Sequence, residues 1–299
     1  MEQRRLGKDG PMVSVIGFGA WPIGGGMGGV DHKTAVETVR ASIDLGITLI
    51  DTAQYYRTSE SIIGEALKGG YRDRCFLATK VSFDYSPAGV RAAMENSLRA
   101  LDVEYVDLYQ VHSWRPAHPI EATMETMAQL QREGKTRYIG VSNFNAAQMR
   151  QAMQTAPFHS NQPVYNMIDR DIEAEDLPFA EREGIGILAH SVLAKGLLTG
   201  KYPPGYVFPP DDERSTFPRF QGESLARYMA MADKLRAIAS DINLTMIELA
   251  VAWVLRLPSV TSALIGAKNP QQLESYLGGV GVTLDAETLA RIDAALASY

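Results

Sequence analysis

Cysteine is almost absent from this chain, which has 299 residues and a single thiol at Cys75. No disulfide can form within the chain, and this favours a reducing compartment. Apolar runs stay short of the roughly 18 residues of a membrane-spanning helix, and the first residues, MEQRRLGKDGPMV, lack the apolar stretch of a signal peptide. The net charge is −6 without a basic block, which argues against nucleic acid. We expect a cytoplasmic protein that binds neither membranes nor nucleic acid.

Histidine is scarce as well, with 5 residues in the whole chain. None of them stands in H-x-H or H-E-x-x-H spacing, and the one cysteine adds little ligand capacity. We therefore expect no metal site.

Apolar residues make up 45% of the chain and charged residues 21%, which is typical of a globular protein. Short runs rich in Val, Ile and Leu alternate with longer stretches of helical period, so we expect one domain over residues 1–299. The predicted strands are 13–21, 47–53, 75–81, 105–113, 138–144, 162–168, 184–193 and 259–267. The predicted helices are 33–45, 59–68, 87–100, 121–133, 146–154, 177–183, 222–240, 245–256, 270–277 and 285–298.

Eight strand–helix units in a chain of this size favour a (β/α)₈ TIM barrel, and an open doubly wound sheet is the competing topology. Polar residues stand near the carboxyl ends of several different predicted strands, and a closed barrel would gather all those ends at one rim. They include Asp51, Lys80, His112, Ser142, Asn143, Gln162, Asn166 and His190.

Two segments interrupt the alternation. The proline-rich stretch 202–221 has no periodicity, and we interpret it as a lid after the seventh strand. The stretch GGGMGG at 24–29 matches G-x-G-x-x-G, the phosphate-binding fingerprint of Rossmann folds. We reject that interpretation because Trp21-Pro22-Ile23 separates the strand from Gly24, and because it leaves Lys80 and His112 unexplained. The glycines are expected to form a flexible loop beside a binding site.

Asp51, Lys80, His112 and a tyrosine after Asp51 are the candidates for chemistry. Singly, each has a structural explanation, since lysine and aspartate form ion pairs and a histidine at a strand end is often a hydrogen-bonded core residue. Together they come from three consecutive strand ends. A lysine about 4 Å from a tyrosine favours the phenolate by about 4 kcal/mol, enough to lower its pKa by about three before desolvation offsets part of this. Such a phenol could protonate a nascent alkoxide, as carbonyl reduction requires. The histidine could orient the substrate oxygen or relay a proton.

The motifs DTAQYYRTSE, IIGEAL, ATKV, DLYQVH, GKTRYIGVSNF, QPVYN and GLLTGKY occur in this order over nearly the whole chain. In combination the chain resembles the aldo-keto reductase superfamily, which implies a (β/α)₈ barrel that binds NADP(H) without a Rossmann fold. The family spacing D-x-x-x-x-Y makes Tyr56 the implied general acid/base and leaves Tyr55 as its neighbour. Lys80 would lower the pKa of Tyr56, Asp51 would hold Lys80, and His112 would complete the tetrad.

The resemblance also implies residues that bind the cofactor. The nicotinamide carboxamide would contact Ser142, Asn143 and Gln162. The segment beside cofactor and substrate would be Gly19, Ala20 and Trp21. The pyrophosphate would lie along Ser191, Leu193, Gly196, Thr199 and Lys201, and the adenosine end along Gly266, Lys268 and Gln272.

Departures from the family pattern concern both ends of the cofactor. His190 stands where the family stacks an aromatic ring on the nicotinamide, and its protonation would weaken binding at low pH. Lys268 is the main cation for a 2′-phosphate, with Arg214 or Arg219 as helpers, so NADP(H) is favoured over NAD(H). Arg115 stands where members often have an acid.

The implied substrate is a small carbonyl compound, or a sugar or alcohol in the reverse direction, in a pocket formed by Trp21, Tyr55, Trp114 and the lid. A cofactor-sensing regulatory subunit with low turnover is an alternative function. A Schiff-base aldolase built on Lys80 is another, although pairing with Asp51 would keep that amine protonated. The sequence defines neither the substrate nor the oligomeric state.

Overall fold

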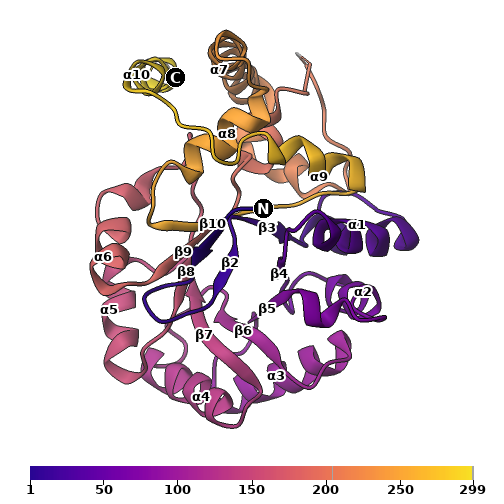
Figure 1. The fold of residues 1–299 in the computed structure, drawn as a ribbon, viewed down its shortest axis with the longest axis vertical. Coiled ribbons are helices and arrows are strands. Elements are labelled where there is room, and N and C mark those ends of the chain that lie inside the picture. Colours follow the sequence, from indigo (N-terminus) through magenta and orange to yellow (C-terminus); the bar gives the residue numbers. More distant parts are fainter. Residues whose placement is uncertain (204, 298–299) are drawn as a thin grey trace.

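The computed structural model describes residues 1–203 and 205–297, and its centre is a closed barrel of parallel strands in the order β10-β3-β4-β5-β6-β7-β8-β9 (Figure 1). The barrel strands are β3 (Ile16–Gly19), β4 (Leu49–Asp51), β5 (Phe76–Val81), β6 (Val106–Val111), β7 (Thr136–Ser142), β8 (Ser160–Gln162), β9 (Gly186–Ala189) and β10 (Val260–Ile265). The predicted (β/α)₈ barrel is confirmed, and the open sheet is wrong because β10 pairs with both β9 and β3.

Helices surround the barrel, and Figure 1 shows α1 to α6 around the strands, with α7 and α10 set further out. They are α1 (His32–Asp44), α2 (Ser59–Ala66), α3 (Pro87–Leu101), α4 (Ile120–Arg132), α5 (Ala146–Thr155), α6 (Asp176–Glu183), α7 (Gly222–Asp241), α8 (Met246–Leu255), α9 (Pro270–Leu277) and α10 (Ala286–Ala297). Each predicted helix is present. Residue 298 of the last predicted helix lies outside the described residues.

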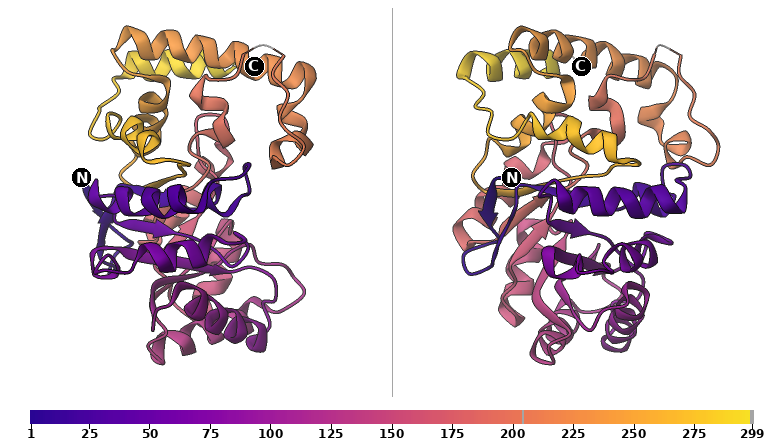
Figure 2. Two further views of the ribbon diagram at one scale, coloured as in Figure 1. Left: turned by 90° about the vertical axis from the view of Figure 1, so that its right-hand side faces the viewer. Right: turned by 45° about the vertical axis from the view of Figure 1, so that its right-hand side comes forward.

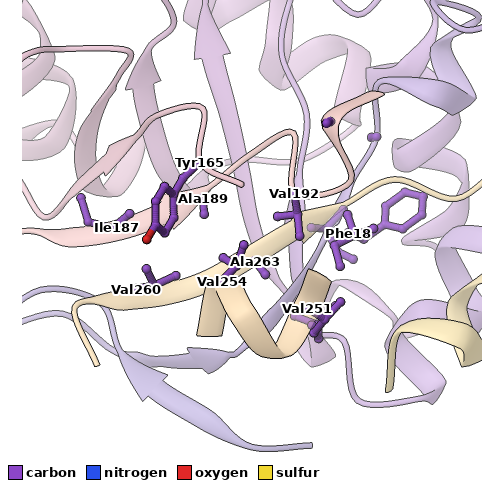
Figure 3. Close-up of a cluster of buried hydrophobic side chains, with 14 of the residues drawn as sticks. Phe18, Tyr165, Ile187, Ala189, Val192, Val251, Val254, Val260 and Ala263 are labelled. Carbon is purple, nitrogen blue, oxygen red and sulfur yellow. The ribbon is translucent and has the colours of Figure 1, made fainter. Parts of the chain in front are cut away.

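The core lies between the barrel and the helices. Figure 3 shows Val251 and Val254 of α8 beside Val260 and Ala263 of β10, with Tyr165 over the neighbouring strand. All five side chains are buried. Apolar side chains on the strands therefore point outward as well as inward, and this explains why the strands appear in the sequence as nearly continuous apolar runs.

An amino-terminal hairpin was not predicted. The expected strand 13–21 is divided into β2 (Met12–Ser14), which pairs with β1 (Gln3–Arg5), and β3 of the barrel. Leu6 and Val13 pack against interior side chains such as Leu49 and Leu188, so the hairpin covers one end of the barrel. The opposite end, where the strands have their carboxyl termini, is left for a site.

The loop from β9 to α7 contains the short 3₁₀ helices η4 (Ala194–Thr199), η5 (Glu213–Thr216) and η6 (Pro218–Phe220). In Figure 2, α7 runs beside α10, above the rest of the molecule. No single helix among the described residues has the length and hydropathy to cross a membrane. Only α7 and α8 taken together pass this test, and they are bent by 84°.

Candidate active site

The four predicted catalytic residues lie together at the carboxyl ends of three neighbouring strands. Asp51 ends β4, Lys80 is the penultimate residue of β5, and His112 directly follows β6. Tyr56 lies in the loop between β4 and α2. The Lys80 Nζ atom donates to Asp51 Oδ2 at 2.6 Å and to the Tyr56 hydroxyl oxygen at 3.2 Å. The Tyr56 and His112 rings meet edge to face with centroids 5.6 Å apart.

Asp51 is the centre of a buried polar network. Its second oxygen, Oδ1, accepts from Gln162 Nε2 at 2.9 Å and from Gln110 Nε2 at 3.1 Å. All of these side chains are buried together with Lys80, whose exposed fraction is 0%. Gln110 was missed by the sequence analysis, although the register of β5 and β6 sets it opposite Lys80.

Lys80 is held in its charged form. Burial alone would lower its pKa, but the Asp51 carboxylate and the Tyr56 oxygen outweigh burial and raise the pKa above its ordinary value. An amine that stays protonated is a poor nucleophile. This argues against the aldolase interpretation.

The pKa of Tyr56 differs from the sequence expectation. Burial of the phenol raises its pKa by more than the Lys80 ammonium lowers it, and the Asp51 carboxylate adds to the increase. The expected net decrease of the Tyr56 pKa is therefore wrong for the protein without a bound cofactor. Asp51 neutralises much of the field of Lys80, because it lies closer to Lys80 than Tyr56 does. Tyr56 therefore keeps its proton at neutral pH.

His112 is neutral. Burial lowers its pKa to about 3, and the charge of Lys80 contributes to the decrease. Its Nδ1 atom lies 2.9 Å from the Ser82 hydroxyl oxygen. Ser82 was not among the predicted site residues.

The nicotinamide end of the predicted cofactor site is a connected set of polar side chains. Ser142 Oγ donates to the carbonyl of Gln162 at 2.8 Å, and Asn143 Nδ2 donates to the carbonyl of His112 at 3.1 Å. Asn143 has a φ of 58° and is exposed. Its Oδ1 atom lies 3.1 Å from His190 Nε2.

His190 is also neutral, because burial lowers its pKa to about 3, with contributions from Lys80 and Lys195. Its Nδ1 atom contacts the Ser191 hydroxyl at 3.0 Å. Protonation of His190 could therefore affect cofactor binding only near that acid pH.

The remaining predicted cofactor residues lie at the end of β3, on the loops that follow β3, β9 and β10, and in the first turn of α9, all at the same end of the barrel. They are Gly19, Ala20 and Trp21, then Ser191, Leu193, Gly196, Thr199 and Lys201, and finally Gly266, Lys268 and Gln272. Left-handed backbone at Ser191, Lys195 and Gly196 turns the second of these loops sharply.

A cavity of about 400 Å³ lies at the predicted adenosine end, and Lys201, Lys268, Arg214 and Gly28 are among its lining residues. Burial lowers the pKa of Lys268, and the nearby Arg214 lowers it further. The same two causes lower the pKa of Lys201. Asp211 and Asp212 line the cavity as well, and three cations against two carboxylates leave it with a positive balance that suits an anion. We call it the cationic cavity.

The two helper arginines have carboxylate partners in the protein alone. Arg214 is buried and donates to both oxygens of Asp212, at 2.8 and 2.5 Å, and Arg219 forms a paired contact with Asp169 at 2.9 and 3.0 Å. Lys268 donates to the Met27 carbonyl oxygen, and its backbone N–H donates to Gln272 Oε1 at 2.9 Å. Lys268 has no carboxylate partner of this kind in the described residues.

The glycine-rich loop meets the lid, since Met27 forms an antiparallel bridge with Asp212. Gly24 and Gly26 are required by close packing, because a Cβ would lie 2.1 Å from the carbonyl oxygen of Tyr56 at the first and 2.1 Å from the Trp21 ring at the second. Their role here is therefore to let the loop approach the site. Gly28 lines the cavity.

A row of aromatic rings extends from the catalytic residues to the surface. Trp21 stacks on Tyr55 with centroids 5.6 Å apart, and Tyr55 contacts Phe83 at 5.9 Å. Tyr55 is 53% exposed and Phe83 is 64% exposed, unusual for large apolar side chains. Phe83 was missed because it stands in a loop without periodicity. Trp114, the third predicted pocket residue, is half-buried and donates to the carbonyl of His118 at 3.0 Å.

Glu213 of the lid also contacts this row. Its Oε1 atom accepts from Trp21 Nε1 at 3.0 Å and from Lys195 Nζ at 2.6 Å. The lid thus fixes the indole that lies edge-on to Tyr56 at 5.1 Å. Over the described part of the chain, no group of His, Cys, Asp or Glu side chains has the arrangement of a metal site.

The architecture is that of a (β/α)₈ barrel with titratable groups gathered at the carboxyl ends of its strands, where barrel enzymes hold their active sites. A model of the aldo/keto reductase family matches residues 15–297. The chain belongs to this family, whose members are oxidoreductases that use nicotinamide cofactors and act on small carbonyl compounds.

Individual relatives cover nearly the whole chain. Aldo-keto reductase YhdN from Bacillus subtilis (strain 168) is 42% identical over 301 residues, 96% of this chain and 91% of that protein. The NADH-specific methylglyoxal reductase from Escherichia coli (strain K12) is 31% identical over 321 residues, 97% of this chain and 98% of that protein. The structure of the glycerol dehydrogenase AKR11B4 from Gluconobacter oxydans is similar, with a TM-score of 0.89 and 36% identity over 99% of this chain and 95% of that one.

Proposed function

We propose that this protein reduces aldehydes or ketones to alcohols with NADPH, or oxidises sugars or alcohols with NADP⁺ in the reverse direction. The observation that carries the proposal is the position of the Lys80 ammonium between the Asp51 carboxylate and the Tyr56 hydroxyl, beside a neutral His112. A phenol that keeps its proton at neutral pH suits a reaction that forms a strongly basic alkoxide.

The chain offers residues for each part of the cofactor. Ser142, Asn143 and Gln162 would bind the nicotinamide carboxamide, the loop after β9 would bind the pyrophosphate, and the cationic cavity would bind the adenosine end. When bound, the cofactor supplies the hydride. Gln162 Nε2 donates to Asp51 Oδ1, so its Oε1 atom would be the group that accepts from the carboxamide NH₂.

The side chains of this protein then handle the proton. Lys80 donates to the Tyr56 oxygen, so the Tyr56 proton is free to point to the substrate oxygen. As that oxygen becomes an alkoxide, Tyr56 protonates it, and Lys80 stabilises the phenolate that remains. Asp51 keeps Lys80 charged throughout.

The preference for NADP(H) depends on Lys268. Its ammonium lines the cationic cavity, and a 2′-phosphate there would receive a charge-assisted hydrogen bond. One relative is named as NADH-specific, so both cofactors must be tested.

The first experiment is a titration of the purified protein with NADPH and with NADH, followed by quenching of tryptophan fluorescence. Micromolar binding of NADPH with much weaker binding of NADH is the expected result, and it should be followed by turnover of a set of aldehydes and ketones. Tight binding of NADPH with turnover that remains slow on every carbonyl compound would favour a cofactor-sensing regulatory subunit. Binding of neither cofactor would refute the proposal.

We predict that Lys268→Ala weakens NADPH binding about 10- to 100-fold and leaves NADH binding within about 2-fold, since a hydrogen bond to a charged group contributes about 1.5–3 kcal/mol. The same titration measures both affinities. Lys33→Ala, on the exposed face of α1, is the matched control and should change neither. Equal losses for both cofactors would assign Lys268 to a part of the cofactor that they share.

We also predict that the two reaction directions depend differently on pH. Reduction needs protonated Tyr56. The pKa of Tyr56 is raised above the ordinary tyrosine value of about 10, so the residue stays protonated throughout the neutral and mildly alkaline range. Oxidation of the alcohol needs the phenolate, whose fraction grows with pH. Over about pH 6 to 9, kcat for reduction should stay level while kcat for oxidation rises. A reductive kcat that falls across that range would contradict the raised pKa.

A further inference from the structure

Ser82 lies beside His112 because the register of two strands puts it there. Val81 of β5 pairs with Val111 of β6, and the backbone N–H of His112 donates to the carbonyl of Val81 at 3.1 Å. The residues that follow the two valines are therefore neighbours. The Ser82 hydroxyl oxygen and His112 Nδ1 are 2.9 Å apart, within hydrogen-bond distance.

The direction of this hydrogen bond decides what His112 can do. A neutral imidazole carries one proton, so one ring nitrogen donates and the other accepts. If Ser82 donates to Nδ1, the proton is on Nε2 and the ring can donate to a substrate oxygen. If Nδ1 donates to Ser82, Nε2 is an acceptor and can only receive a proton.

The other contacts of Ser82 favour the first arrangement. The alternative acceptor for its hydroxyl proton is the carbonyl of Lys80, 3.4 Å away, longer than an ordinary O–H···O hydrogen bond. Were Nδ1 the donor, that poor acceptor would be the one left for the Ser82 proton among its contacts with the described residues. The 2.9 Å contact to His112 gives the hydroxyl proton a good acceptor when Ser82 is the donor.

We propose that Ser82 is a positioning residue that holds His112 as the tautomer protonated at Nε2. The proposal rests on the carbonyl reductase function, and it decides between the two roles left open for the histidine. His112 donates a hydrogen bond to the substrate oxygen beside Tyr56 and does not relay a proton. The proton that reaches the alkoxide then comes from Tyr56 alone.

The surroundings of the ring agree with a neutral donor. Burial of the ring and the Lys80 ammonium on β5 disfavour a second proton on His112, and His190 after β9 would add to this only once it is itself protonated. The rings of Tyr55 and Tyr56 pack edge-on to His112 from the loop after β4. The ring is therefore neutral over about pH 5 to 8, where an ordinary histidine changes charge. Its effect on the reaction should not vary over that range.

Nuclear magnetic resonance of the ring nitrogens tests the proposal without any turnover. Protein with isotope-labelled histidine side chains gives signals from 5 imidazole rings. The signals of His112 are assigned as those that disappear in the His112→Asn variant. We expect Nδ1 without a proton and Nε2 with one, unchanged over about pH 5 to 8. A proton on Nδ1 in the wild-type protein would overturn the proposal, whatever the protein catalyses. The proposed function fails separately, if the wild-type protein neither binds nor uses a nicotinamide cofactor.

Kinetics of three substitutions at Ser82 give the second test. Ser82→Ala removes the donor and should lower kcat about 5- to 10-fold, the effect of one hydrogen bond. Ser82→Asp offers only an acceptor at neutral pH, so it should move the proton to Nδ1 and lower kcat further. Ser82→Thr keeps a hydroxyl and should restore most of the activity and the wild-type ring signals.

The control is Ser61→Ala, which removes an exposed hydroxyl of α2 and should change neither kcat nor the His112 signals. Cofactor affinity should stay within about 2-fold in all four variants, so that the loss appears in kcat. A Ser82→Asp variant as active as the wild type would refute the role of Ser82.

Discussion

Replacing Tyr56 with phenylalanine is expected to lower kcat for carbonyl reduction about 10³-fold, within the range of general acid catalysis. The substitution removes the proton donor and keeps the ring that packs against Trp21 and His112. The affinity for NADPH should change less than about 3-fold, because no cofactor contact is assigned to this hydroxyl. Steady-state kinetics with one aldehyde and the fluorescence titration measure the two quantities.

Tyr55→Phe is the matched control, because it removes the same group from the adjacent position. Tyr55 is 53% exposed, and its ring stacks on Trp21, away from the contacts of Lys80. We expect kcat within about 3-fold of the wild type. A large loss in Tyr55→Phe together with an active Tyr56→Phe would reverse the assignment of the two tyrosines. That assignment follows the family spacing, and in the structure it agrees with the Lys80–Tyr56 hydrogen bond.

Much of the fold could be predicted from the sequence because most elements carry a local signal. The polar strand β8 does not, and the predicted strand 162–168 shares only Gln162 with it. Parallel strands buried on both faces appear as apolar runs, and amphipathic helices separate them. The amino-terminal hairpin could not be predicted in the same way. Its strand β2 is followed by β3 after one residue, so a single apolar run conceals the change from hairpin to barrel.

The candidate site was predictable where residues stand at strand ends. Asp51, Lys80 and His112 are adjacent because neighbouring parallel strands end at one rim, and this follows from topology alone. Ser82, Gln110 and Glu213 were missed because their relevance depends on register and on the path of the lid. Nothing in the sequence distinguishes Glu213 from the other acids of the lid until its contact with Trp21 is known.

The pKa of Tyr56 illustrates a further limit of sequence reasoning. A full lysine charge near the phenol, as the sequence suggests, would lower the pKa of Tyr56. In the structure Asp51 is 2.6 Å from the ammonium and Tyr56 is 3.2 Å from it, so the phenol experiences a paired charge in a buried setting. Desolvation then dominates. The sign of a pKa shift depends on differences of this size, which only coordinates supply.

Substitution of Asp51 by asparagine is expected to reduce both stability and activity strongly. The carboxylate accepts from Lys80 on Oδ2 and from Gln110 and Gln162 on Oδ1. Asparagine has one oxygen, so its amide nitrogen would face either the ammonium or the two glutamine donors. Removing one partner of a buried ion pair leaves an uncompensated charge, which costs about 3–5 kcal/mol of unfolding free energy. We expect kcat to fall at least about 10²-fold, since Lys80 loses the group that holds it.

The double variant Asp51→Asn/Lys80→Met separates the two effects. Methionine fills much of the space of the lysine stem without the buried charge, so more than half of the lost unfolding free energy should return, as measured by urea denaturation at one pH. Activity should not return, because the ammonium that stabilises the Tyr56 phenolate is gone. If the double variant were no more stable than Asp51→Asn, the destabilisation would come from the broken contacts to Gln110 and Gln162. If the single variant kept its activity, Lys80 would need no carboxylate to act on Tyr56, and Asp51 would be a purely structural partner.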